Sequence, residues 1–109
     1  MKLIFAIIED KDSNRLINAL GKENFQTTKI SSTGGFLKEG NTTLMVGCED
    51  EYVDQVLEII KNNSSKREQM VSPVSPISGN IDSYIPHTIN IEVGGAIVFV
   101  LPVEQFHQF

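Results

Sequence analysis

The sequence predicts an α+β domain of the ferredoxin-like class, in which two helices pack on one antiparallel sheet. Three observations predict this class: an apolar run near each end of the chain, two segments with helical apolar spacing, and two threonine-rich segments between them. In chain order they read strand, helix, strand, strand, helix, strand, which is the split βαβ arrangement. A chain of 109 residues is long enough for one such domain, spanning residues 1–109.

The first half begins with the continuous apolar run Leu3 to Ile8, which is typical of a buried strand. Asp10 and Asp12 follow this run and can cap a helix. From Ser13 to Glu23 apolar residues recur at helical spacing, with charged and amide side chains between them. This segment therefore predicts an amphipathic first helix.

Two threonine-rich segments, Phe25 to Ser32 and Thr42 to Cys48, predict the second and third strands. A glycine-containing segment joins them, so we expect a hairpin with a short connection. Cys48 ends an apolar run and is the only cysteine, which predicts a small core residue and no internal disulfide.

The second helix is predicted after Cys48, because acidic residues crowd its start and Lys61 lies at its end, an order that complements the helix dipole. A region with several prolines and glycines then runs to about Ile89 and predicts an enlarged, irregular loop. Residues 89–93 alternate, Gly94 and Gly95 interrupt, and Ala96 to Leu101 predicts the last strand.

Both faces of the central strands require burial, because Leu3 to Ile8 and Ile97 to Leu101 are apolar at successive positions. Two helices cover only one face of such a sheet. We therefore expect another copy of the chain on the second face; an exposed patch or cover by the long loop are the alternatives.

Composition excludes several function classes. The net charge of −5 disfavours binding to a nucleic-acid polymer, and no segment approaches membrane-spanning length. A single free thiol is typical of the reducing cytoplasm, so we expect a cytoplasmic protein. His87 and His107 have no partner at metal-ligand spacing, and no nucleophile stands beside a base, so neither a metal, a cofactor nor catalysis is predicted.

The segment Thr33 to Thr43 is the main candidate site. It combines glycines, which let the backbone approach a ligand, with the aromatic ring of Phe36 and the amide of Asn41. Thr28 on the preceding strand adds a hydroxyl group, and together these groups could cradle a base and a phosphate. The alternative is a plain hairpin turn in which the glycines serve only the backbone.

Two aromatic features near the C-terminus carry further interpretations. Phe99 in the last strand is most simply a core residue. The tail ends in Phe106-His107-Gln108-Phe109, and two terminal phenylalanines indicate that it docks on this chain or on a neighbour. Docking at a subunit boundary would bring Gln108 near a site.

Several separated motifs, in this order and over the whole chain, resemble the PII-like cyclic-di-AMP receptors of Gram-positive bacteria. They are Thr33-Gly34-Gly35-Phe36-Leu37, Gly40-Asn41-Thr42-Thr43, Asp82-Ser83-Tyr84-Ile85-Pro86, Glu92-Val93-Gly94-Gly95-Ala96 and Phe106-His107-Gln108-Phe109. The resemblance implies a homotrimer that binds cyclic-di-AMP in clefts between subunits, rearranges loops on binding, signals to an unknown protein partner and has no catalytic activity.

The resemblance also implies a set of ligand-binding positions, which replaces the core interpretation of Phe99. In this role Phe36 packs on an adenine and Asn41 reads a base edge. The implied positions are Asn24, Gln26, Thr28, Gly35, Phe36, Leu37, Asn41, Gly47, Phe99 and Gln108.

Position 26 departs from the family, which typically carries an arginine near the ligand phosphate where this chain has Gln26. Losing a charge-assisted contact costs about 1.5 to 3 kcal/mol, so we expect weaker binding, altered ligand preference, or compensation by Lys29 or a water molecule. The alternative function is a PII-like trimeric module that binds another nucleotide or only a protein partner.

Overall fold

The computed structural model describes residues 1–32, 40–71 and 89–109. Its elements follow the predicted order, with one additional pair of strands before the last one. In chain order they are β1 (Lys2–Glu9), α1 (Asp10–Lys22), β2 (Thr27–Ser32), β3 (Asn41–Cys48), the short 3₁₀ turn η1 (Asp50–Tyr52), α2 (Val53–Ser64), β4 (Arg67–Val71), β5 (Ile89–Val93) and β6 (Ala96–Pro102).

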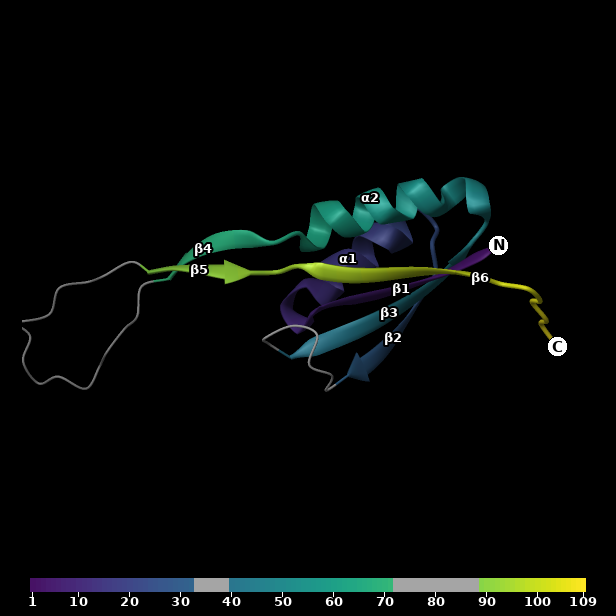
Figure 1. The fold of residues 1–109 in the computed structure, drawn as a ribbon, viewed down its shortest axis with the longest axis horizontal. Coiled ribbons are helices and arrows are strands. Elements are labelled where there is room, and N and C mark those ends of the chain that lie inside the picture. Colours follow the sequence, from purple (N-terminus) through teal and green to yellow (C-terminus); the bar gives the residue numbers. More distant parts are fainter. Residues whose placement is uncertain (33–39, 72–88) are drawn as a thin grey trace, which may run out of the picture.

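Four strands form an antiparallel sheet in the order β2-β3-β1-β6, and α1 and α2 lie together on one side of it (Figure 1). This confirms the predicted mixed domain of an antiparallel sheet with two helices, and it is consistent with a ferredoxin-like fold. Residues 33–39, between β2 and β3, lie outside the described residues.

The core lies between the sheet and the helices. Strand alternation sends Ile4, Ala6 and Ile8 of β1 toward the helix layer, and all three are fully buried. The rest of the buried cluster comes from α1, β3 and α2: Leu16, Leu20, Leu44, Val46, Cys48, Val56 and Ile60. The prediction of Cys48 as a core residue is confirmed, and burial raises the pKa of its thiol, with Asp50 and Glu49 nearby adding to the effect.

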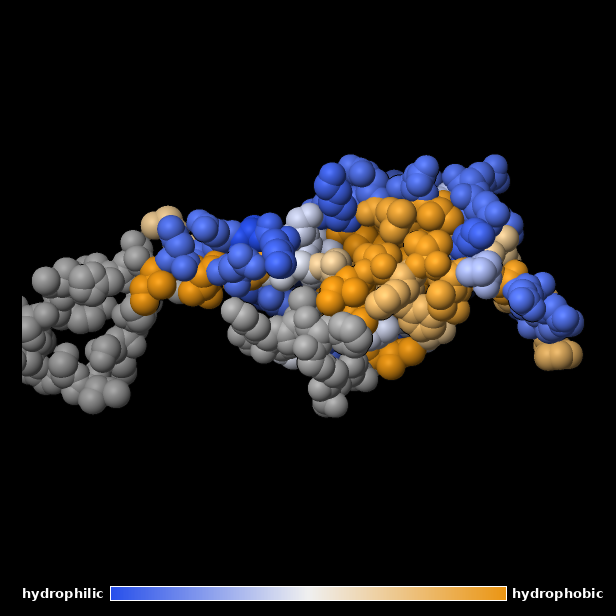
Figure 2. Space-filling view, in the orientation of Figure 1, coloured by the Kyte–Doolittle hydropathy of each residue, from blue (hydrophilic) through white to orange (hydrophobic). Residues whose placement is uncertain are grey.

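The opposite side of the sheet, here called the open face, is also apolar. Phe99 is 46% exposed, Leu101 44% and Ile30 42%. Figure 2 shows hydrophobic side chains gathered over the middle of the domain, where β6 runs. By strand register the apolar side chains of the open face are Leu3, Phe5, Ile7, Ile30, Met45, Ile97, Phe99 and Leu101.

Both helices differ from the sequence prediction at one end. α1 begins at Asp10 rather than Ser13, and neither Asp10 nor Asp12 caps it, because both lie in its first turn. α2 starts only at Val53, because Asp50–Tyr52 form the 3₁₀ turn η1, and it ends at Ser64. The side-chain hydroxyl of Ser64 donates to the carbonyl oxygen of Ile60, which satisfies this polar group within the helix.

The prediction of irregular structure up to Ile89 is wrong for Arg67–Val71, which forms β4. This strand pairs antiparallel with β5, from Arg67 opposite Val93 to Val71 opposite Ile89. We call the paired strands β4 and β5 the arm. Figure 1 shows the arm extending beyond the end of α2, away from both termini.

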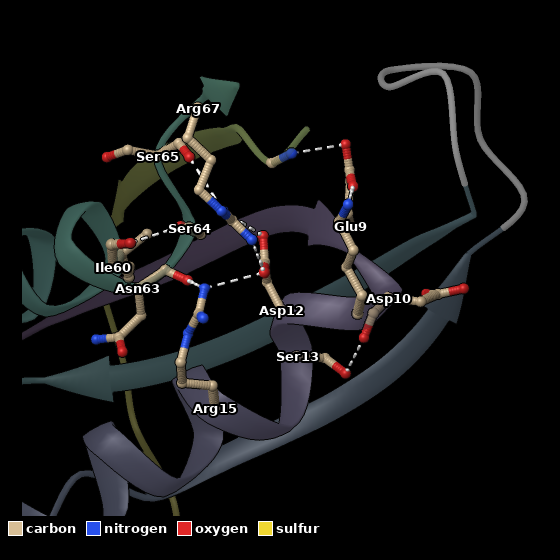
Figure 3. Close-up of polar contacts among 12 residues, drawn as sticks. Glu9, Asp10, Asp12, Ser13, Arg15, Ile60, Asn63, Ser64, Ser65 and Arg67 are labelled. Atoms are coloured by element: carbon tan, nitrogen blue, oxygen red, sulfur yellow. Dashed lines mark hydrogen bonds and ion pairs between the residues drawn. The ribbon is translucent and has the colours of Figure 1, made fainter. Parts of the chain in front are cut away.

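A cluster of polar contacts ties the arm to the domain (Figure 3). The carboxylate of Asp12 is 1% exposed and accepts hydrogen bonds from Nη2 of Arg67 at 2.8 Å and from Nη2 of Arg15 at 3.0 Å. The bond to Asp12 holds the pKa of Arg67 above its ordinary value. On the other side of the arm base, the backbone N–H of Gly94 donates to Oε1 of Glu9 at 2.9 Å.

Gly94 should be essential for this attachment. Its φ is +82°, and a Cβ there would lie 2.5 Å from Nη1 of Arg67 and 2.6 Å from the carbonyl oxygen of Ser65. We expect Gly94→Ala to lower the free energy of unfolding by at least about 2 kcal/mol in urea denaturation, because strain and overlap add. Gly21→Ala is the control: a Cβ in that exposed helical position meets nothing within 4 Å, and about 0.5 kcal/mol should be gained. Equal stabilities of the two variants would contradict this assignment.

Candidate functional site

The predicted site residues that lie in the four-stranded sheet share its open face. Thr28 lies opposite Met45, Gly47 opposite Leu3, and Asn41 opposite Glu9, all in rows that point away from the helices. Phe99 lies opposite Phe5 on the same face. Gln26 precedes β2 by one residue and is exposed, and alternation gives it the same side as Thr28.

These residues do not form a single pocket within one chain. Thr28, Met45, Phe5 and Phe99 form one row across all four strands, with Thr28 on the β2 edge and Phe99 on the β6 edge. Three strand spacings separate the two residues by roughly 14 Å. The site residues therefore divide between a β2–β3 part and a β6 part at the opposite edge.

The simplest interpretation of Phe99, as a core residue of the last strand, is wrong for this chain, because nearly half of its side chain is exposed. Lys29 does not lie where it could compensate for Gln26. It lies opposite Leu44, whose side chain is in the core, and thus on the face opposite Thr28. Compensation for Gln26 by Lys29 on the open face is therefore disfavoured.

Gly47 leaves open space in the β2–β3 part. A Cβ built at this exposed strand position meets nothing within 4 Å, so packing of the described residues does not require glycine. Glycine weakens a strand interior, and it often marks a place where a ligand or another backbone approaches closely. The region beside Gly47 is therefore suited to close approach by a group from outside the chain.

Asn24 has a structural role besides its implied ligand contact, because the end of α1 lies at this residue, as an asparagine after an amphipathic helix predicts. Its φ is +66°. The N–H of Asn24 donates to the carbonyl oxygen of Gly21 at 3.0 Å, and the N–H of Phe25 donates to the carbonyl oxygen of Leu20 at 2.9 Å. This pair of bonds is the Schellman motif that ends a helix. The turn also places Asn24 beside Gln26 in a surface pocket of about 600 Å³, lined further by Ile17, Gly21, Phe25 and Thr27.

A second pocket, of about 380 Å³, lies where β1 ends and β3 begins. It is lined by Glu9, Asp10, Lys11 and Gly40. Asn41, which is 3% exposed, follows Gly40 and lies opposite Glu9 in the sheet. Sequence reasoning missed the charged residues of this pocket, because acidic residues after a strand are also typical of a helix start.

The remaining predicted site positions either lie outside the described residues or are exposed in the C-terminal tail. Gly35, Phe36 and Leu37 lie outside the described residues. Gln108 is exposed in the tail, where His107 stacks on Phe109 with ring centroids 5.9 Å apart. Phe106 and Phe109 are 66% and 113% exposed, so the tail does not bury these rings on the described part of this chain.

Within the described ranges, no three His, Cys, Asp or Glu side chains group in a way that could hold a metal ion. In the same ranges, no helix is long and apolar enough to cross a membrane. The chemistry that the site offers is instead hydrogen bonding by amide, hydroxyl and backbone groups beside apolar side chains.

Fold and candidate site together define a small α+β domain with polar groups and exposed apolar side chains on one face of its sheet. The family model described as cyclic-di-AMP receptor matches residues 1–109, and the chain belongs to this family. The family resemblance drawn from the sequence motifs is therefore confirmed. A solved structure of a functionally unknown protein from Pediococcus pentosaceus ATCC 25745 is also similar: it is 46% identical, has a TM-score of 0.82, and the match covers 99% of this chain and 96% of that chain.

The conformation of Asn24 separates its structural role from a ligand contact. We expect Asn24→Ala to lose about 1 kcal/mol of stability in urea denaturation, because alanine disfavours the left-handed region, and Asn24→Gly to lose none. If the amide also contacts a ligand, both variants weaken binding to the same extent although their stabilities differ. Equal stability of the alanine and glycine variants would contradict the role in the helix end.

Proposed function

We propose that this protein is a non-enzymatic receptor that binds cyclic-di-AMP in clefts between the subunits of a cytoplasmic homotrimer. Membership of the cyclic-di-AMP receptor family supports the ligand. The observation that carries the intersubunit location is the division of the site residues between opposite edges of one sheet face. A ligand beside Thr28 meets the Phe99 of another copy more readily than the Phe99 of its own chain.

Contact between different edges also has a consequence for assembly. A β2 edge that meets the β6 edge of the next copy is a head-to-tail contact, which either closes into a ring or continues as a filament. A closed ring of three copies has three identical clefts and turns its apolar open faces toward one another. Fully burying a Phe, Leu or Ile side chain contributes about 1.5 to 3 kcal/mol, so covering half-exposed side chains such as Phe99 favours this ring.

Within each cleft we assign the base end to Asn41 and Phe36, and the phosphate end to Gln26, Thr28 and the open backbone at Gly47. Asn24, Gly35 and Leu37 complete the part from one subunit, and Phe99 and Gln108 come from the neighbour. Ligand binding then changes the conformation of loops that a downstream protein partner reads.

The alternative is a trimeric module that binds another nucleotide or only a protein partner. Gln26 favours this alternative, because an amide donates only neutral hydrogen bonds where the family typically has an arginine. The difference predicts which substitution should improve binding of cyclic-di-AMP.

We expect calorimetric titration with cyclic-di-AMP to give micromolar or tighter binding, and Gln26→Arg to tighten it by about ten- to hundred-fold through a charge-assisted contact to phosphate. Asn18→Arg adds the same charge on α1, on the other side of the sheet, and should leave the affinity within about twofold. Asn41→Ala should abolish binding while circular dichroism shows a folded protein. Heat from another nucleotide, with none from cyclic-di-AMP at millimolar concentration, would favour the alternative.

The trimer is tested by the exposed ring of Phe99. We expect the wild type to sediment as a trimer, and Phe99→Asp to shift it to smaller species, because a carboxylate on the open face would be buried unpaired. Tyr52→Asp is the control, since Tyr52 is exposed to a similar degree (44%) but lies in η1 at the start of α2. A stable wild-type monomer at micromolar concentration would refute the proposed assembly.

A further inference from the structure

The turn from β1 into α1 contacts two parts of the molecule that are far apart in sequence. We call its residues Glu9, Asp10 and Asp12 the junction. On one side the junction holds the start of β3: the N–H of Asp10 donates to the carbonyl oxygen of Gly40 at 2.9 Å, and Oγ1 of Thr42 donates to Oδ1 of Asp10 at 2.5 Å. These contacts flank Asn41, a proposed ligand residue.

On its other side the junction holds the base of the arm. Glu9 accepts the N–H of Gly94, next to β5, and Asp12 accepts both terminal nitrogens of Arg67, the first residue of β4, at 2.8 and 3.3 Å. Figure 3 shows Arg67 reaching Asp12 on one side and a backbone N–H reaching Glu9 on the other. Both strands of the arm are thus attached to the same short turn.

Burial makes these attachments hard to change one at a time. Glu9 is 6% exposed and Asp12 1%, so neither carboxylate has water in place of a lost donor. Leaving a buried carboxylate without its donors is costly, and packed groups shift together rather than deform smoothly. A displacement at Gly40 and Thr42 therefore moves the junction, and the junction moves Gly94 and Arg67.

We propose that the junction couples occupancy of the site at the start of β3 to the position of the arm, with Glu9 and Arg67 as positioning residues. This inference rests on the proposed function for its ligand. Coupling between two sites is reciprocal, so the factor by which the ligand shifts the arm between attached and detached states equals the ratio of the ligand affinities of those two states.

A ligand-free experiment tests the mechanical link. Thr42→Val removes the hydrogen bond to Asp10 at the β3 side, and we expect the amide of Gly94 at the arm side to exchange its hydrogen at least about threefold faster by NMR. Thr28→Val is the matched control, because Thr28 lies on β2 away from the junction. Unchanged exchange at Gly94 in Thr42→Val, or equal acceleration in both variants, would overturn the link.

A second experiment follows the arm during titration with cyclic-di-AMP. Met70 is 67% exposed on β4 and Cys48 is buried, so Met70→Cys can be labelled selectively with an environment-sensitive fluorophore. We expect the ligand to change the fluorescence, and added Arg67→Lys to reduce that change by at least half. Arg15→Lys is the control: Arg15 contacts the same carboxylate but belongs to α1, so the response should persist.

The outcomes separate this inference from the proposed function. If the labelled protein does not bind cyclic-di-AMP, the proposed function fails, and the exchange of Gly94 alone decides the mechanical link. If it binds and the response survives Arg67→Lys as fully as Arg15→Lys, the coupling through the junction is overturned while the receptor function stands.

Discussion

The structure depends on one constraint: its central strands are apolar on both faces, and two helices cover only one. Burial of Ile4, Ala6 and Ile8 against the helices fixes the register of β1, which in turn commits Phe5 and Ile7 to the open face. In the proposed trimer other copies cover that face, and the polar groups near its edges then lie at a subunit boundary. The proposed location of the site thus rests on the distribution of apolar residues.

Local patterns were sufficient to predict the elements that form this sheet. The continuous apolar run Leu3 to Ile8 indicates a strand that is buried on both faces, although apolar and polar residues do not alternate in it. Apolar residues at helical spacing indicate α1 and α2. β4 escaped prediction because Arg67-Glu68-Gln69-Met70 has neither alternation nor β-branched side chains. β4 forms because it pairs with β5 and because its first residue, Arg67, bonds to Asp12, which lies 55 residues earlier in the chain. No local pattern contains that information.

The site was less predictable than the fold, for a physical reason. Glycine, asparagine and threonine serve turns and helix ends as readily as ligands, and Asn24 shows this ambiguity directly because its conformation ends α1. Register resolves part of the ambiguity: it joins Thr28, Gly47 and Phe99 on one face, which no spacing in the sequence reveals. The family motifs were needed to connect these residues to one ligand.

The two ends of β3 differ in the charge of the residues around them. Its first end meets the pocket lined by Glu9, Asp10 and Lys11, whereas Gly47 near its other end lies opposite the apolar Leu3. In the proposed receptor, the carboxylates of Glu9 and Asp10 disfavour a phosphate at the first end, and neutral hydrogen-bond donors of Gln26 and Thr28 are available to it at the other. Bases, which carry donor groups that carboxylates and Asn41 accept, suit the acidic end. In the proposed receptor, the phosphates of the ligand therefore lie toward Gln26 rather than toward the acidic end of β3.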